Sequence, residues 1–171
     1  MRVIGGEFRS RRISSIPGEA TRPTPDRLRE TLFDILQTRI EGATFLDAYA
    51  GTGAVGIEAL SRGASHAYFL EKNKAALEAI RGNLASLGAQ FRATVVAGPV
   101  LKNLAACRAD IVFLDPPYAL EKEYAAALAL LSAAPPSLIV VQHSVRLPMP
   151  GASRVVRQGD NALSFFTETA D

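Results

Sequence analysis

A glycine-rich segment, residues 47–56, stands where the first predicted strand turns into a helix. Gly51, Gly53 and Gly56 match the spacing of the dinucleotide-binding fingerprint, and Glu71 ends the next predicted strand. Glycines let a ligand approach the backbone and the helix-start amides closely, and an acid in the position of Glu71 binds a ribose diol. The segment therefore predicts a nucleotide-like ligand rather than a tight turn with a purely structural role.

Asp47 narrows the class of ligand. It lies four residues before Gly51, at the carboxyl end of the same strand, so we expect its side chain to face the same crevice. A carboxylate there repels a pyrophosphate, because like charges a few ångströms apart are costly in a partly desolvated site. It suits a ligand that carries an ammonium and a sulfonium group, and S-adenosylmethionine carries both. We therefore predict S-adenosylmethionine as the cofactor.

A second motif, Asp115-Pro116-Pro117-Tyr118, follows an apolar run at the carboxyl end of the fourth predicted parallel strand, the edge where ligands bind in open α/β sheets. The prolines hold the backbone extended, so the Asp115 side chain and the Pro116 carbonyl can both accept hydrogen bonds from one exocyclic amine. Tyr118 offers a stacking face for a purine, worth about 1–3 kcal/mol. Such a site would aim the amine at a methyl group, and Asp115 would take the proton released.

From residue 43 onward the sequence alternates strand and helix patterns. The runs 111–114 and 138–141 are apolar without alternation, as in strands covered by helices on both faces. We predict strands over 44–50, 66–71, 92–97, 110–114 and 137–142, helices over 54–62, 73–87, 99–106 and 121–132, and an antiparallel hairpin from 154–157 and 162–167. The fold class is α/β, a mostly parallel, doubly wound sheet that ends in an antiparallel hairpin.

The first 40 residues form a basic extension, with eight arginines against five acids, whereas the whole chain has a net charge of only +2. Two short stretches, 2–5 and 11–16, predict a β-hairpin. Arg9, Arg11 and Arg12 flank its turn and can reach a phosphate backbone, although an ordinary solvated edge has the same composition.

A helix is predicted over 25–38, because apolar residues there recur at helical spacing. Thr24 is the predicted N-cap and Pro25 the first helical residue.

Composition excludes other classes of protein. The chain has 171 residues, enough for one domain, with a single cysteine and two histidines, which argues against a metal centre. No apolar run is long enough to span a bilayer and the start lacks a signal-peptide pattern, so we expect a cytoplasmic protein. We predict a single methyltransferase domain, 1–171, in which 1–40 is the extension and 41–171 the catalytic core, and a monomer.

The sequence resembles the RsmD family of 16S ribosomal RNA guanine methyltransferases. Besides the motif at 115–118, which is the amino-methyltransferase signature, the resemblance rests on Arg22-Pro23-Thr24 with the run 26–33, on the opening 4–12 and on the cofactor segment 46–64. It implies a Rossmann-like class I methyltransferase fold and methyl transfer from S-adenosylmethionine to the 2-amino group of one guanine. The implied partner is 16S rRNA in the small ribosomal subunit or its assembly intermediate.

Site residues are carried over where the motifs match. The cofactor set is Asp47, Tyr49, Gly51, Thr52, Gly53, Glu71, Lys72 and Val100; the catalytic set is Asp115, Pro116, Pro117 and Tyr118; the RNA set is Arg9, Arg11, Arg12, Arg22 and Thr24.

Three positions depart from the family's usual pattern. Ser10 replaces a glycine, and Pro99 replaces an acid that holds the adenine amine, so we expect the Val100 backbone to serve adenine. Gln142-His143 stands where a glutamate is common, and a histidine at a strand end is more often structural than a substrate contact.

Two other functions also fit parts of the sequence. The glycine spacing and Glu71 agree with an NAD-dependent oxidoreductase, although Asp47 opposes a pyrophosphate and no proton-donor pair is evident. A non-catalytic RNA-binding assembly factor fits the basic extension, but such a protein has no need for the acceptor geometry of Asp115 and Tyr118.

Overall fold

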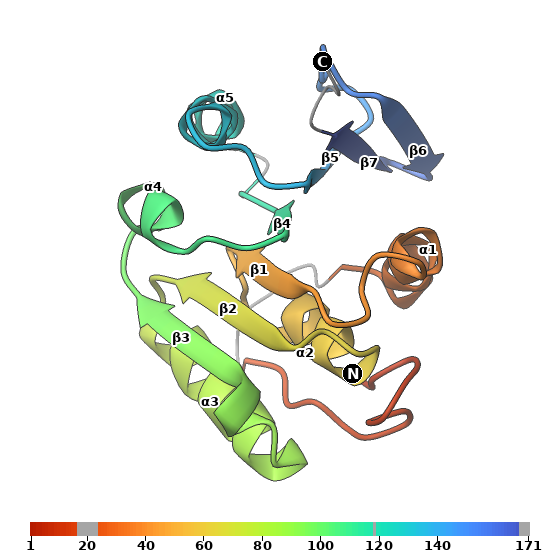
Figure 1. The fold of residues 1–171 in the computed structure, drawn as a ribbon, viewed down its shortest axis with the longest axis vertical. Coiled ribbons are helices and arrows are strands. Elements are labelled where there is room, and N and C mark those ends of the chain that lie inside the picture. The colour runs from red at the N-terminus through yellow and green to blue at the C-terminus, as the bar shows by residue number, and fades with distance from the viewer. Residues whose placement is uncertain (17–23, 118, 168–171) are drawn as a thin grey trace.

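The computed structural model describes residues 1–16, 24–117 and 119–167. Seven of its strands form one sheet in the order β3-β2-β1-β4-β5-β7-β6 (Figure 1). The strands are β1 (Thr44–Ala48), β2 (His66–Glu71), β3 (Ala93–Ala97), β4 (Ile111–Leu114), β5 (Leu138–Ser144), β6 (Arg154–Gln158) and β7 (Asn161–Thr167).

Strands β1 to β5 are parallel, and β7 runs antiparallel to both β5 and β6. The predicted doubly wound sheet with a closing hairpin is therefore confirmed. The first strand ends at Ala48 rather than at residue 50, because Tyr49 has a left-handed backbone with φ of 65°. The fifth strand extends to Ser144 because β7 pairs with it along its whole length, from Leu138↔Thr167 to Ser144↔Asn161.

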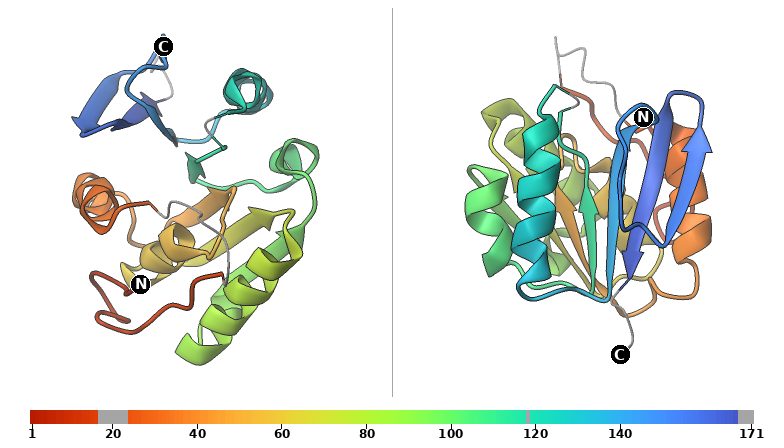
Figure 2. Two further views of the ribbon diagram at one scale, coloured as in Figure 1. Left: turned by 180° about the vertical axis from the view of Figure 1, so that it is seen from behind. Right: turned by 90° about the horizontal axis from the view of Figure 1, so that it is seen from above.

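Helices cover both faces of this sheet, as the two views of Figure 2 show. On one face, α1 and α2 pack over β1, β4 and β5, and α3 packs over β2; on the other, α4 and α5 cover the remaining apolar side chains. The helices are α1 (Asp26–Leu36), α2 (Ala54–Ser61), α3 (Lys74–Leu87), α4 (Val100–Asn103) and α5 (Glu121–Ser132), with 3₁₀ turns η1 (Gln90–Arg92) and η2 (Leu104–Ala106). The helix predicted over 99–106 is thus divided between α4 and η2.

The predicted N-terminal hairpin is reduced to one antiparallel bridge, between Arg2 and Arg12. The Val3 amide donates to the Arg11 carbonyl and the Ile13 amide to the Met1 carbonyl on either side of this bridge, and the Ser10 amide donates to the Val3 carbonyl nearer the turn. Ser10 adopts a left-handed backbone with φ of 68°, the conformation that favours glycine at this position. The segment does not extend into a ladder, because several of its polar backbone groups bond to α2 instead.

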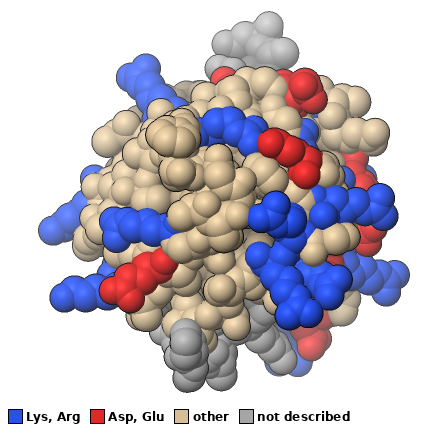
Figure 3. Space-filling view, turned by 90° about the horizontal axis from the view of Figure 1, so that it is seen from below, with Lys and Arg blue, Asp and Glu red and all other residues tan. Residues whose placement is uncertain are grey.

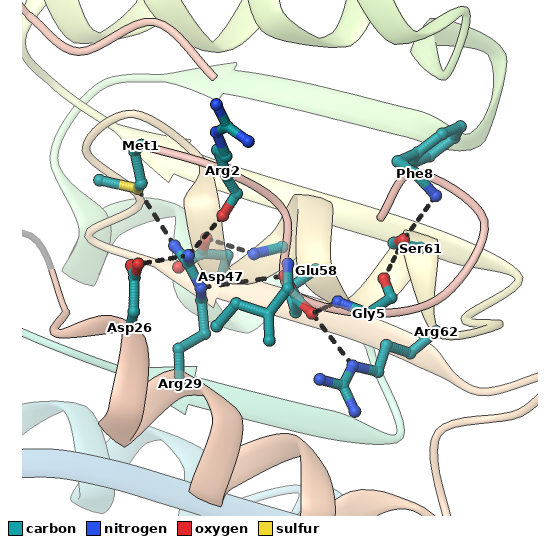
Figure 4. Close-up of polar contacts among 12 residues, drawn as sticks. Met1, Arg2, Gly5, Phe8, Asp26, Arg29, Asp47, Glu58, Ser61 and Arg62 are labelled. Atoms are coloured by element: carbon teal, nitrogen blue, oxygen red, sulfur yellow. Dashed lines mark hydrogen bonds and ion pairs between the residues drawn. The ribbon is translucent and has the colours of Figure 1, made fainter. Parts of the chain in front are cut away.

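Glu58, on α2, is the centre of those bonds (Figure 4). Its carboxylate accepts the backbone amides of Ile4 and Gly5, both at 2.9 Å, and lies 3.8 Å from the Nε of Arg29 on α1. Arg29 in turn donates to the Arg2 carbonyl at 2.7 Å. Both charged side chains are fully buried, so this pair joins the N-terminal segment, α1 and α2 into one packed unit.

The start of α1 corrects one prediction. Pro25 occupies the N-cap position and no side chain caps the helix, so the expected role of Thr24 as an N-cap is wrong. The Thr24 hydroxyl instead donates to Gln142 Oε1 at 2.9 Å. Because the hydroxyl bonds to a residue on β5, it does not cap the free amides of the first helical turn.

Across the described ranges, none of the helices has the length and apolar composition needed to cross a membrane.

Candidate active site

A cavity of about 870 Å³ opens at the carboxyl edge of the parallel strands. This volume lies in the range of small-molecule binding sites. Its walls come from the ends of β1, β2, β4 and β5, the start of α1 and the β6–β7 turn. Predicted site residues in its lining are Thr24, Asp47, Tyr49, Gly51, Thr52, Glu71, Lys72, Val100, Asp115, Pro116 and Pro117.

Gly51 and Glu71 lie together in the wall of the cavity. Gly51 has φ of 57°, and a Cβ built on it would meet nothing within 4 Å, so the loop leaves open space beside the backbone. The Gly51 amide donates to Glu71 Oε2 at 2.9 Å, and the amides of Lys72 and Asn73 donate to Oε1, each at 2.8 Å. Three backbone donors thus hold this carboxylate at the end of β2.

Asp47 is almost completely buried, with 2% of its surface exposed. Its Oδ2 accepts the Gly56 amide at 2.8 Å, in the first turn of α2. Burial raises the pKa of Asp47 well above its usual range; the Gly56 amide opposes the rise, and the charges of Asp115 and Glu71 add to it. All three carboxylates line the same cavity, so each disfavours the ionised form of its neighbours.

Gly53 and Gly56 do not line the cavity. A Cβ on Gly53 would lie 3.3 Å from both Ile80 and Phe69, and one on Gly56 would lie 2.4 Å from the Phe69 ring. Both glycines therefore let α2 pack closely on β2 and α3. Of the three glycines in the fingerprint, the structure brings only Gly51 to the cavity.

Tyr49 connects the wall of the cavity to α5 by a hydrogen bond. Its hydroxyl donates to Glu123 Oε2 at 2.5 Å, and both residues line the cavity. Burial, together with the Glu123 carboxylate, raises the pKa of Tyr49, so the hydroxyl stays protonated as a donor. Glu123 had no motif to mark it in the sequence.

Asp115 follows β4 directly and lines the cavity. Its backbone amide donates to the Ala48 carbonyl at 3.4 Å, so the turn remains attached to β1. Burial raises the pKa of Asp115 to about 7. A carboxyl group with a pKa near neutrality can accept a proton during a reaction and release it afterwards.

The Pro116 carbonyl has a partner that the sequence did not predict. The buried Tyr124 hydroxyl, on α5, donates to it at 3.1 Å. A carbonyl oxygen has two lone pairs, so one remains for a second hydrogen bond. The motif is therefore braced by α5 as well as by its own prolines.

Gln142 and His143 differ in environment although they are adjacent. Gln142 lines the cavity beside the Asp115 turn, whereas His143 does not. The His143 ring is buried and bonded to Ser164 Oγ at 2.7 Å and to the Ser144 carbonyl at 2.8 Å. Burial lowers the pKa of His143, which keeps the ring neutral. The structural interpretation of His143 is therefore correct.

The β6–β7 turn, residues 158–161, was missed as part of the site. Its residues are part of the cavity wall. The predicted hairpin contained a signal for it: because β7 is antiparallel to β5, its first residue, Asn161, lies beside Ser144 at the carboxyl edge.

Among the predicted RNA-binding residues, Arg9, Arg11 and Arg12 are exposed on the N-terminal segment. Seen from below, the side on which this segment lies in Figure 1, Lys and Arg side chains gather over part of the surface (Figure 3). Arg11 also donates to the Ser86 carbonyl on α3 at 2.8 Å, so its guanidinium is partly engaged. Arg22 and Tyr118 lie outside the described residues. Within the described residues, no cluster of His, Cys, Asp and Glu side chains could hold a metal ion.

Comparisons with known proteins agree with this fold. A family model described as "Conserved hypothetical protein 95" matches residues 1–166. "Putative rRNA methyltransferase YlbH" of Bacillus subtilis is 33% identical over 159 residues, 88% of this chain and 86% of that protein.

"Ribosomal RNA small subunit methyltransferase D" of Escherichia coli is 42% identical over 120 residues, which cover 69% of this chain but only 60% of the relative. The solved structure of "Putative methyltransferase yhhF" from Escherichia coli superposes with a TM-score of 0.87 at 34% identity, covering 100% of this chain and 99% of that one. The chain therefore belongs to the RsmD family and has its Rossmann-like class I methyltransferase fold.

Proposed function

We propose that this protein uses S-adenosylmethionine to methylate the exocyclic 2-amino group of a guanine in 16S ribosomal RNA, in the small subunit or its assembly intermediate. The observation that carries the proposal is the cavity that joins Asp47 and Glu71 to Asp115 and Pro116. We call the part lined by Asp47, Gly51 and Glu71 the cofactor half, because it suits a cationic nucleoside, and the part lined by Asp115 and Pro116 the base half, because it suits an amine. The names of the relatives support an rRNA substrate, and such a substrate agrees with a cytoplasmic location.

The residues present fit this cofactor. The Glu71 carboxylate would accept a hydrogen bond from a ribose hydroxyl with its remaining lone pair, and Asp47 would offset the cationic end of the ligand. Gly51 leaves room at the backbone, and Val100 lies in the wall where we expect the adenine. When bound, S-adenosylmethionine supplies an electrophilic methyl group on a positively charged sulfur.

NAD fits the same site poorly. The amide of Gly51 is taken by Glu71 and that of Gly56 by Asp47, so two amides of the glycine segment already have anionic partners. A pyrophosphate would need such amides as donors and would lie beside both carboxylates.

The base half would act by positioning the target amine. The Asp115 carboxylate and the Pro116 carbonyl would accept the two N–H groups of that amine and direct the nitrogen lone pair towards the methyl carbon. As positive charge develops on that nitrogen, Asp115 would stabilise it and then accept the proton. The pKa of about 7 suits this role. Tyr118, the last residue of the motif, is proposed as the stacking partner of the base.

The test is to incubate the protein with labelled S-adenosylmethionine and small-subunit particles that lack this modification, and to map any methylated nucleotide. We expect one guanine carrying a methyl group on N2. Label on another base would contradict the guanine-N2 proposal, and tight NAD binding without S-adenosylhomocysteine binding would contradict the cofactor. If RNA binds but receives no label, the protein is an assembly factor on a methyltransferase scaffold.

The exposed arginines of residues 1–12 are proposed to bind RNA phosphates. Replacing Arg9, Arg11 and Arg12 by glutamine should weaken RNA binding and flatten its dependence on salt, by about one unit of log–log slope for each phosphate that is no longer neutralised. Because Arg11 is bonded to Ser86, the pair Arg9 and Arg12 should account for most of the change. An unchanged salt slope in the triple variant would refute this role of the arginines.

A further inference from the structure

Gln142 is a buried polar residue at the base half of the cavity. It is 3% exposed and lies on β5, in the cavity wall. Its Oε1 accepts the Thr24 hydroxyl at 2.9 Å, and Thr24 is itself 7% exposed. Among the described residues, Thr24 provides the side-chain hydrogen bond of Gln142, and the Nε2 group is not one of the fully enclosed polar atoms that lack a partner, so it reaches the cavity. An amide that is held at its oxygen and open to the cavity at its nitrogen is a donor that a ligand acceptor can satisfy.

The sheet register brings this amide beside the catalytic turn. The last pair of the β4–β5 ladder is Leu114↔Val141, so Asp115, the residue directly after β4, and Gln142 on β5 each follow one member of this pair. Both residues line the cavity. An acceptor, Asp115, and a donor, Gln142, therefore lie at the ends of adjacent parallel strands, where the base would bind.

On its Watson–Crick edge guanine presents the 2-amino donor and the O6 acceptor, with the N1–H donor between them. Adenine has no amine at position 2 and carries a donor, not an acceptor, at position 6. A base that gives its 2-amino group to Asp115 would therefore bring O6 towards the neighbouring amide. The Thr24 hydroxyl, by occupying Oε1, keeps the amide in the orientation that guanine needs.

We infer that Gln142, oriented by Thr24, hydrogen-bonds the O6 side of the target base and makes the site selective for guanine. The inference rests on the proposed methylation of a guanine 2-amino group. It assigns a specificity role to Gln142 and a positioning role to Thr24 in the same site.

The experiment uses RNA in which the mapped guanine is replaced by 2-aminopurine, which keeps the 2-amino group but lacks O6 and the N1 hydrogen. This RNA is built by ligation and compared with the guanine form, with the wild-type enzyme and with Gln142→Met. The contribution of Gln142 is therefore measured by the change in preference between wild type and variant. We expect the wild type to prefer guanine in kcat/KM by about tenfold, the value of one buried hydrogen bond with its desolvation cost. Gln142→Met should reduce kcat/KM on guanine by about tenfold and change little on 2-aminopurine.

Thr24→Val is the matched variant, because it keeps the size of the side chain and the Gln142 donor. It should also reduce the kcat/KM preference for guanine over 2-aminopurine, by a smaller factor than Gln142→Met does. Binding of S-adenosylhomocysteine should be unchanged in both variants, which controls for folding.

The outcomes separate the two hypotheses. Equal losses on guanine and 2-aminopurine would make Gln142 merely structural, and a wild type without preference would overturn the inference while guanine methylation stands. Absence of methylation on either RNA by the folded wild type would instead count against the proposed function.

Discussion

The two halves of the cavity are built in different ways. In the cofactor half, backbone amides hold the carboxylates: Gly56 donates to Asp47, and Gly51 donates to Glu71. In the base half, side chains from distant segments hold the site: Tyr124 braces Pro116 and Thr24 orients Gln142. A backbone-held half depends on loop geometry, whereas a half held by side chains can be altered by single substitutions.

This contrast predicts that changes in one half leave the other working. A cofactor-half variant should lose cofactor affinity, and a base-half variant should lose methyl transfer with cofactor affinity intact.

The largest effect should follow Asp115→Asn. The amide cannot take the proton and stabilises the developing positive charge poorly, so we expect methyl transfer to fall by about 10³-fold. Calorimetry should show unchanged S-adenosylhomocysteine affinity. A similar loss of S-adenosylhomocysteine affinity would show that Asp115 belongs to the cofactor half and would contradict the independence of the two halves.

The pH dependence should report the same residue. Because the ionised form of Asp115 is the acceptor and its pKa is about 7, kcat/KM should rise about tenfold per pH unit below that value and level off above it. The free energy of unfolding should change in the opposite direction. Folding raises the pKa of Asp115 from about 4 to about 7, so between these pH values the carboxyl group ionises more readily in the unfolded state. Wild type should therefore lose stability relative to Asp115→Asn as pH rises through this range. Denaturant titrations of both proteins across this range test the second statement, and parallel pH curves would contradict it.

Asp47→Asn should act on the other half. Asparagine keeps an oxygen acceptor for the Gly56 amide but removes the negative charge, so affinity for the cationic cofactor should fall by about tenfold. Saturating cofactor should restore most of the transfer rate. If the rate stays low at saturation, Asp47 also serves the base half.

The smallest effect is expected for Tyr124→Phe. Loss of the hydroxyl removes one brace from the Pro116 carbonyl, worth about 1 kcal/mol, or roughly fivefold in kcat. Tyr49→Phe is the matched control, because it removes a hydroxyl that bonds to the same helix, α5, without touching Pro116. Equal effects of the two variants would show that α5 acts through general packing.

Much of the fold was predictable because strand and helix periodicities are local properties of the chain. The succession of strands and helices along the chain followed from them, and it placed the glycine segment and the Asp115 motif at the ends of strands. The hairpin of residues 2–5 and 11–16 is limited to the bridge between Arg2 and Arg12, because Glu58 and Ser61 on α2 provide partners for the backbone of that segment. Thr24 was assigned to the wrong partner for the same reason: a capping pattern describes neighbours in sequence, whereas Gln142 is 118 residues away.

The sequence by itself determined the chemistry available at the cavity: the carboxylates Asp47, Glu71 and Asp115 stand at strand ends, and parallel strands bring such ends to one edge. Only the tertiary structure decided which of these groups have partners. It brought Gly51, but not Gly53, to the cavity, added the β6–β7 turn to the wall, and set Gln142 beside Asp115. The physical reason is that hydrogen-bond satisfaction and burial depend on the packing of segments far apart in the chain, which no local pattern encodes.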